Sequence, residues 1–495
     1  MRITNNMIMK NSISNIGSTK EQTSKLNNQM TSQKKITKAS EDPVIAIRSL
    51  RLRNSQAQIN QYYKNNIPDA RSWLTNTETS LTNIKKIVND VYAQCVEGAN
   101  DTLDISNRKI ILNALSALRA DVYSEGDSEY SGRTLFTGFK TGSTLTFTEE
   151  ETATSYSITQ TLSFDDMESY RYYPNQIDIP SDLTGLNGST SIDQVTEVDQ
   201  YRIRLAYDDI FTDDPAPTSL DIKMSDGSAV TAHVMSYADW EDLDFAIGDN
   251  DAYVIKETGE LILGSDLAEN IRAYKKDLTL TYDKTGFGKG EVRPEFYYDC
   301  VDKTDPINPV TYKYEDQQIK YTIATNTTLT VNVQAADVYS SAIGRDIDEM
   351  VSACDAAIKA QEKVDEIEGM ISSPTYTNDP DAQAYLSNLL EAAQRERDYL
   401  NDNMQKLFSQ GIENFQSYLS DTSNAISDVG NKLTQLELVE SRMSATSSDI
   451  KALISDNEDM DLSEIVIEYT AAYNAYESAL LAASKASSNT LLDYL

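Results

Sequence analysis

Few residues of this chain have the types and spacing that catalysis requires. The 495 residues include one histidine, His233, which lies between Ala232 and Val234 in a run typical of a β-strand. No serine or cysteine has the sequence context of a known nucleophile. The glycines of residues 286–290 precede Glu, Val and Arg, so they predict a turn rather than a nucleotide-binding loop. We therefore expect no catalytic and no cofactor-binding residue, and no enzymatic activity.

Metal binding has equally little support in the sequence. Cys95, Cys300 and Cys354 are too widely spaced for a disulfide framework or a metal site, and we expect them to be buried as small apolar residues. Two acidic clusters, residues 221–226 and 456–461, lack the alternating ligands and distal glutamate of a calcium-binding loop. The sequence therefore predicts solvated loops at both clusters and no metal.

Charge and hydropathy exclude two classes of partner. The formal net charge is −35, which would repel nucleic acid and anionic lipid. No stretch approaches eighteen consecutive apolar residues, so we expect no insertion into a membrane. The first thirty residues also lack the apolar segment of a cleaved signal peptide.

The strongest pattern is a heptad repeat near the end of the chain. Residues 426–454 carry apolar side chains in steps of three and four for about four heptads, skipping the polar Ser447, which predicts a coiled coil. After the acidic cluster at 456–461 a second repeat begins. The first repeat is Ile426, Val429, Leu433, Leu436, Val439, Met443, Ile450 and Ile454, and the second is Leu462, Val466, Tyr469, Tyr473, Tyr476, Leu480 and Ala483.

A partner for these narrow stripes is expected at the other end of the chain. Residues 1–40 contain seven basic residues and one acidic residue, a net charge of +6, whereas residues 420–495 have a net charge of −9. Opposite charge favours side-by-side pairing of the two terminal segments. The N-terminal segment also has a thin stripe of its own: Met9, Ile13, Ile16, Thr23 and Met30. Both stripes are thin, so we expect the tails to be largely disordered in an isolated molecule and to pair as antiparallel helices on assembly.

Between the termini the period of the apolar residues changes twice. Ser40 is the expected N-cap of a helix with Pro43 in its first turn, and Pro68 is expected either to kink a second helix or to begin it. Gly98 is the expected end of that helix, and a third helix follows. The second helix carries Ile67, Ala70, Leu74, Thr77, Leu81, Ile84, Val88, Val91 and Cys95, and the third carries Ile111, Leu115, Leu118 and Val122.

From about residue 142 to 335 the helical period gives way to short alternating runs rich in Thr, Tyr and Val, which predict strands at 144–148, 156–161, 278–282, 318–323 and 328–333.

The fold class that follows is mainly α with a β-rich insert. Residues 1–42 and 455–495 are expected to form terminal assembly helices. Residues 43–141 and 336–454 are expected to form a helical bundle. Residues 142–335 are expected to form a β-rich lobe that projects from the bundle.

Five short motifs, in order along the chain, resemble the flagellin superfamily, and within it the hook-associated protein 3 type. They are MRITNNM at 1–7, KITKASEDPV at 35–44, GRTLFTGFKT at 132–141, TLTVNV at 328–333 and NTLLDYL at 489–495. Glu41 and Leu492 depart from the family pattern, and residues 142–327 match no part of it.

The resemblance implies a structural protein of the bacterial flagellum at the hook–filament junction. It implies secretion through the flagellar type III export apparatus with an export chaperone, and assembly with further copies of itself, with the first hook-associated junction protein and with flagellin. Filament flagellin is the nearest alternative, because its chain order is the same. A surface enzyme carried on the insert and a cytoplasmic coiled-coil scaffold are more distant alternatives.

Candidate site residues fall into two groups. The expected assembly interface consists of Ile3, Met9, Ile13, Ile16, Met30, Val466, Tyr469, Tyr473, Tyr476, Leu480, Leu491, Leu492, Tyr494 and Leu495. The residues that match family motifs are Asp42, Pro43, Gly132, Arg133, Phe136 and Gly138.

Overall fold

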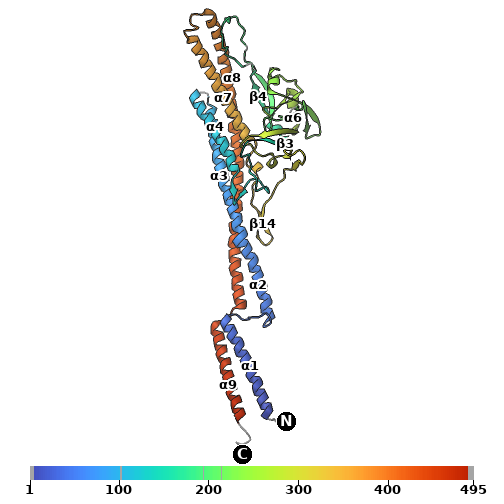
Figure 1. Ribbon diagram of the computed structural model, residues 1–495, viewed down its shortest axis with the longest axis vertical. Helices are drawn as coiled ribbons and strands as arrows, with labels where there is room; N and C mark the ends of the chain where they lie inside the picture. Colours follow the sequence, from blue (N-terminus) through green and yellow to red (C-terminus); the bar gives the residue numbers. More distant parts are fainter. Residues whose placement is uncertain (1–4, 101–102, 175, 193, 213–214, 489–495) are drawn as a thin grey trace, which may run out of the picture. The chain divides into compact units, whose positions relative to one another are not determined.

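A computed structural model describes residues 5–488 apart from 101–102, 175, 193 and 213–214. The chain divides into two compact units (Figure 1). We call residues 1–71, 321–329 and 433–495 the terminal unit, and residues 72–320 and 330–432 the larger unit. None of the helices in the described part of the chain is long and apolar enough to cross a membrane.

The terminal unit is built around an antiparallel pair of helices, α1 (Asn5–Ser32) and α9 (Leu462–Ser488). It also contains α2 (Pro43–Gln61), which is followed by a π-helical turn at Tyr62–Asn66. The part of α8 (Pro380–Glu458) that follows residue 432, together with residues 321–329, also belongs to this unit. The expected pairing of the two chain ends is therefore present (Figure 1).

The start of α2 corrects one detail of the prediction. The N-cap is Asp42 rather than Ser40: its Oδ1 accepts hydrogen bonds from the backbone N–H groups of Val44 at 2.9 Å and Ile45 at 3.2 Å. Pro43 occupies the first helical position, where a missing N–H costs nothing. Aspartate satisfies two otherwise unpaired donors here, and its charge suits the positive end of the helix dipole.

Helix α3 (Ile67–Gly98) confirms the most regular repeat in the sequence. All nine of its predicted seam residues, from Ile67 to Cys95, are fully buried. Pro68 is the second residue of α3 and directly follows the π-helical turn, which connects α2 and α3 without a break. The helix ends at Gly98, where any larger side chain would collide with the ring of Phe408.

The remaining helices of the larger unit form a bundle with the part of α8 that lies in this unit. Helix α4 (Ile105–Gly126) packs on α7 (Ala342–Ser372), and a short loop connects α7 to α8. At the loop end of α7 and α8, an apolar cluster combines both helices with the segment 177–195 of the insert. The insert is therefore packed against the helices at this end.

The insert contains a ten-stranded sheet in the order β12-β11-β3-β10-β6-β7-β8-β9-β5-β4. Every neighbouring pair is antiparallel except β7 and β8, which are parallel. The ten strands are β3 (Glu151–Leu162), β4 (Glu168–Tyr172), β5 (Val198–Arg204), β6 (Ser219–Met224), β7 (Ala229–Met235), β8 (Ala252–Ile255), β9 (Glu260–Leu263), β10 (Leu278–Phe287), β11 (Asp299–Asp302) and β12 (Val310–Tyr312).

Besides three short 3₁₀ turns, the described part of the insert region contains two hairpins and two short α-helices. The hairpins are β1 (Glu129–Tyr130) with β2 (Arg133–Thr134), and β13 (Lys320–Ala324) with β14 (Thr327–Thr330). The helices are α5 (Tyr237–Glu241) and α6 (Ser265–Tyr274). The predicted strand at 144–148 is wrong, because these residues form only an isolated bridge between Thr146 and Val292. Leu145 and Phe147 still form backbone hydrogen bonds with residues 290–293, but this pairing is too short to make a strand.

Candidate assembly surface

The inner face of the α1–α9 pair is small. Leu26 of α1 and Ile465 and Ala472 of α9 are its buried side chains, and Met30 and Tyr469 pack beside them. The Thr23 hydroxyl donates a hydrogen bond to the backbone carbonyl of Ala472 at 3.3 Å. Three buried side chains between two long helices stabilise the pair only weakly.

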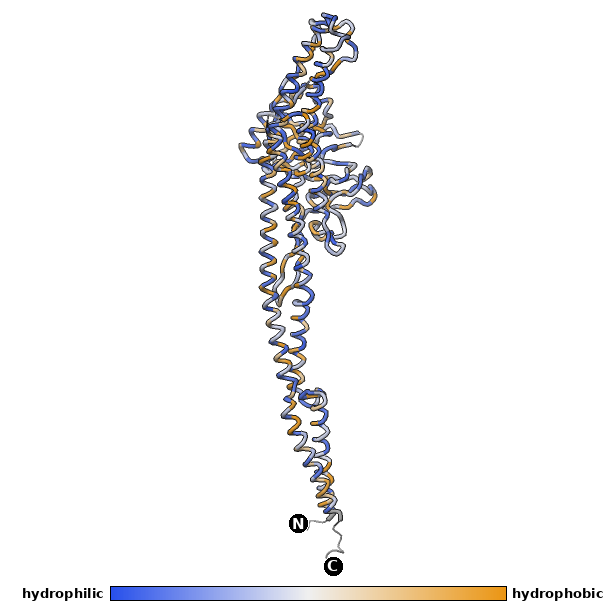
Figure 2. Tube along the Cα trace, turned by 90° about the vertical axis from the view of Figure 1, so that its left-hand side faces the viewer, coloured by the Kyte–Doolittle hydropathy of each residue, from blue (hydrophilic) through white to orange (hydrophobic). Residues whose placement is uncertain are grey.

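The outer face of α9 is apolar and exposed. Of the predicted stripe, Val466, Tyr473 and Leu480 lie on this face rather than against α1, and Leu462, Ile467 and Leu481 extend it. Tyr469 and Tyr476 are half-buried. Figure 2 shows hydrophobic positions along the helices next to the two termini. The single predicted stripe is therefore two stripes: one packs against α1, and the other is exposed.

Helix α1 leaves an apolar surface of its own. Met9 and Ile13 are exposed, as are the neighbouring Met7 and Ile8, while Ile16 is half-buried. On α2, Val44, Ile47 and Leu50 are also exposed, and this helix has no buried residue. Contiguous exposed apolar side chains on several helices are typical of surfaces that another chain covers.

Five predicted interface residues lie outside the described residues: Ile3, Leu491, Leu492, Tyr494 and Leu495. The structure adds three interface residues that the sequence reasoning missed: Leu26, Ile465 and Ala472. The steps of four, three and four from Ile465 through Tyr469 and Ala472 to Tyr476 identify the two α9 residues, but the predicted stripe runs through Val466 and Tyr473, one position further along the chain.

Polar contacts fix the junction between α8 and the segment after α1. The Lys35 N–H donates to the Glu458 carbonyl at 2.7 Å, and the Met460 N–H donates to the Gln33 carbonyl at 3.1 Å. The Lys34 ammonium pairs with the carboxylates of Glu458, at 3.4 Å, and of Asp459. The predicted attraction between basic N-terminal and acidic C-terminal residues is thus concentrated at one junction.

Glu458 is the centre of this junction. Its nearly buried carboxylate accepts hydrogen bonds from the Arg53 guanidinium at 2.6 and 2.8 Å, and from the Ser49 hydroxyl. The hydrogen bonds from Arg53 lower the pKa of Glu458 to about 2, against the opposing effect of burial. The expectation that residues 456–461 form a solvated loop is therefore wrong at Glu458, which ends α8 and is held by α2. Spacing alone could not show that α2 supplies its partners.

The α8 repeat is confirmed in part. Val429, Leu436, Val439 and Met443 are buried as predicted, and Ser447 is buried as well. The other predicted members are only half-buried: Ile426, Leu433, Ile450 and Ile454. A small polar side chain occupies the next position of the seam, so the buried stripe continues through the residue that the sequence reasoning skipped.

The predicted motif residues have structural roles. Asp42 caps α2, and the Arg133 guanidinium lies 5.4 Å from the centre of the Trp73 ring. Phe136 is buried with its ring edge-on to Tyr339 at 5.3 Å. Gly132 and Gly138 have φ of 72° and 62°, the left-handed region that favours glycine. The segment 132–138 is thus a tightly turned connection between α4 and the insert.

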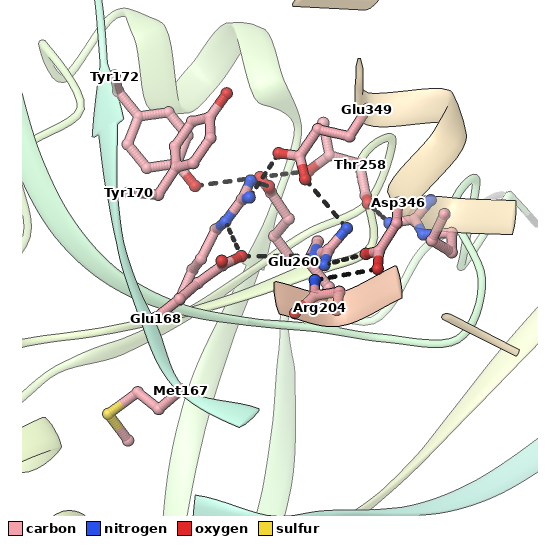
Figure 3. Close-up of polar contacts among 12 residues, drawn as sticks. Met167, Glu168, Tyr170, Tyr172, Arg204, Thr258, Glu260, Asp346 and Glu349 are labelled. Carbon is pink, nitrogen blue, oxygen red and sulfur yellow. Dashed lines mark hydrogen bonds and ion pairs between the residues drawn. The ribbon is translucent and has the colours of Figure 1, made fainter. Parts of the chain in front are cut away.

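A group of carboxylates in the larger unit is the nearest approach to a catalytic constellation. Glu168, Glu260 and Glu349, which Figure 3 labels, each form an ion pair with the Arg202 guanidinium. A cavity of about 500 Å³ lies beside them. Arg204 adds ion pairs with Glu349 at 3.0 Å and with Asp346.

Arginine satisfies these carboxylates. Burial raises the pKa of Glu168 despite Arg202 and Arg204. Burial also acts to raise the pKa of Glu349, but the two arginines outweigh it and the pKa lies below its usual value. Each nitrogen of the Arg202 guanidinium donates a hydrogen bond to a different carboxylate. The network therefore connects β4, β5 and β9 to α7. All three carboxylates are engaged by arginine, and none of them is free to transfer a proton. Among the described residues, no group of three or more His, Cys, Asp or Glu side chains could hold a metal ion.

Comparison with known proteins shows what the chain is similar to. Residues 3–141 match the model of the bacterial flagellin N-terminal helical region. This part of the chain therefore resembles a flagellin N-terminal region. It contains α1 to α4 and ends with the turned segment that precedes the insert. The resemblance drawn from the short motifs is thereby confirmed.

Two curated relatives are similar to part of the chain. Flagellar hook-associated protein 3 of Salmonella typhimurium is 28% identical over 146 residues, which are 28% of this chain and 44% of that protein. Flagellar hook-associated protein 3 of Escherichia coli K12 is 26% identical over 156 residues, 30% of this chain and 47% of that protein. The chain thus spans about half the length of the curated relatives it matches.

Solved structures include a flagellar hook-associated protein 3 from Legionella pneumophila. It shares 11% identity with the chain at a TM-score of 0.31, with 82% of this chain and 97% of that one covered.

Proposed function

We propose that this chain is a structural protein of the bacterial flagellum that joins the hook to the filament. The exposed apolar face of α9, beside a flagellin-type N-terminal region, is the observation that supports this most directly. A helix in water gains nothing from displaying Val466, Tyr473 and Leu480, so the face is best explained by contact with neighbouring chains. The relatives named hook-associated protein 3 favour the junction over other positions in the flagellum.

Assembly would proceed by burying the outer faces of α1 and α9 against neighbouring copies. Each Å² of apolar surface removed from water contributes roughly 25 cal/mol. The contacts would be head-to-tail and would repeat along a helix, because a surface on one copy meets a different surface on the next. The first hook-associated junction protein would contact one end of this helical assembly of copies, and flagellin would contact the other end.

Secretion follows from the same proposal. Tails held together by so small an inner face can open and be carried by an export chaperone to the type III export apparatus, which would release the chain at the cell exterior. The proposed role is a structural one, which the relatives named hook-associated protein 3 support.

Filament flagellin remains the alternative that shares this architecture. Electron microscopy of a strain lacking the gene distinguishes the two. A missing junction protein leaves hooks without filaments and unattached flagellin in the medium, whereas a missing filament protein leaves no flagellin there. Finding no flagellin in the medium would favour the alternative.

Truncation tests the role of the termini. A chain that lacks residues 1–30 is expected to retain the folded larger unit and to fail to restore motility to the deletion strain, because α1 and its exposed surface are removed. Restored motility with the truncated chain would contradict the proposal.

A further inference from the structure

Lys284 is a buried lysine that neither the assembly surface nor the arginine network uses. It lies on β10, and its side chain is only 3% exposed. Its ammonium is 3.7 Å from Oδ1 of Asp208 and 3.5 Å from Oε1 of Glu291, and it donates a hydrogen bond to the Asp208 backbone carbonyl at 2.7 Å. The rings of Phe287 and Tyr207 lie 5.4 and 5.9 Å from the same nitrogen. An amine, a carboxyl group and a second carboxyl group therefore meet in an aromatic site.

The three groups are held in place by separate segments of backbone. The loop that carries Asp208 is fixed at both sides, by a hydrogen bond from the Leu205 N–H to the Gly259 carbonyl at 2.8 Å and by one from the Phe211 N–H to the Asp283 carbonyl at 2.8 Å. Glu291 Oε2 accepts a hydrogen bond from the Gly288 N–H at 2.8 Å, so its Oε1 is directed at Lys284. Because the backbone already holds the three side chains close together, a reaction between them avoids the entropy loss of bringing two separate molecules together.

We propose that Lys284 and Asp208 form an intramolecular isopeptide bond, with Glu291 as the group that transfers protons. Glu291 takes a proton from the Lys284 ammonium and passes it to Oδ1 of Asp208. The neutral Lys284 nitrogen then attacks Cγ of Asp208 and forms the new C–N bond. Glu291 moves a second proton from that nitrogen to Oδ1, the Cγ–Oδ1 bond breaks, and one water molecule leaves.

The balance of the step requires no further reactant. One positive and one negative charge disappear, one water is released, Glu291 returns to its starting state and nothing is oxidised or reduced. Burial raises the pKa of Glu291, although Lys284 opposes the shift, which suits a carboxyl group that holds a proton in transit. The Arg345 guanidinium lies 2.7 Å from Oδ2 of Asp208 and would stabilise the negative charge that forms on this oxygen during attack.

The chain contains a matched pair that should not react. The Lys303 ammonium is 2.9 Å from both carboxylate oxygens of Asp283, closer than the Lys284 contact. The two aspartates are similarly exposed, Asp208 by 39% and Asp283 by 40%, but Lys303 is 42% exposed whereas Lys284 is only 3% exposed. Water solvates the exposed Lys303 ammonium, and an ammonium ion is not a nucleophile. Proximity alone would link Lys303, whereas burial beside Glu291 would link Lys284.

Mass spectrometry of the purified full-length chain tests the proposal. The expected result is an intact mass lower than the sequence mass by one water molecule, and a branched peptide that joins Lys284 to Asp208 after proteolysis. Glu291→Gln is expected to slow bond formation in refolded chain by about a hundredfold or more, the usual contribution of a general acid–base.

Three results would overturn the proposal: an intact mass equal to that of the sequence with a linear Lys284 peptide, a link at Lys303, or a link from Lys284 to Glu291. The first would mean that Lys284 is an ordinary buried ion pair. The wild-type mass decides this even if Glu291→Gln does not fold. The outcome is independent of the proposed flagellar role.

Discussion

At the scale of single residues, two carboxylates determine how the terminal unit is held. Asp42 begins α2, and Glu458 joins the end of α8 to the same helix. The importance of Asp42 could be read partly from the sequence, since acids and a proline follow Ser40, but the choice between Ser40 and Asp42 depended on backbone geometry. Glu458 could not be identified, because its partners Ser49 and Arg53 are about four hundred residues away in the chain.

Replacing Asp42 by alanine tests the cap. Asp42→Ala is expected to cost about 1 kcal/mol of local stability, because two backbone donors lose their acceptor. That cost corresponds to roughly fivefold faster amide exchange at Val44 and Ile45, measured by hydrogen exchange. Ser40→Ala is the matched control and should change nothing. Equal effects of the two substitutions would contradict the cap assignment.

The titration of Glu458 tests the junction. Its folded pKa, about 2, lies below the ordinary value of 4.5, so its stabilising contribution is complete above about pH 4.5 and is lost as the pH falls toward 2. NMR of the side-chain carboxyl carbons should show one glutamate that titrates near pH 2, and Glu458→Gln should remove that signal. A Glu458 signal that titrates near pH 4.5 would show that Arg53 does not hold it.

At the scale of elements, prediction succeeded where contacts are periodic and local. The α3 seam was predicted at all nine positions, because a helix with steps of three and four has only one way to bury that stripe. The α9 stripe was divided wrongly, since Ala472 belongs to the inner face and Tyr473 to the outer one. The strand order of the insert could not be predicted, because neighbours such as β3 and β10 are more than a hundred residues apart in sequence.

Hydrogen exchange of the isolated chain tests how weakly the terminal helices are held. Amides of α1 and α9 are expected to exchange at least a hundredfold faster than those at the centre of α3, because the α1–α9 pair has three buried side chains and α3 has a continuous buried seam. The α3 amides in the same sample are the control. Equal protection of the two sets would show that the pair is stable without neighbours.

At the scale of the whole molecule, the two units have separate tasks in this account. The terminal unit carries exposed apolar helix faces, whereas the larger unit carries a ten-stranded sheet tied to α7 by buried arginines. The flagellin-like sequence of residues 3–141 belongs to both units. The fold class was predictable from the change in apolar period. The proposed function rests on short motifs, not on any catalytic residue.

The central claim is that the outer face of α9 drives assembly. The most direct measurement is the swimming of a deletion strain that expresses a chain with Val466→Ser, Tyr473→Ser and Leu480→Ser. Tyr274→Ser, which removes an even more exposed aromatic side chain from α6 of the insert, is the control. The account predicts that the triple variant is secreted but leaves hooks without filaments, while the control swims normally. Normal swimming of the triple variant would contradict it.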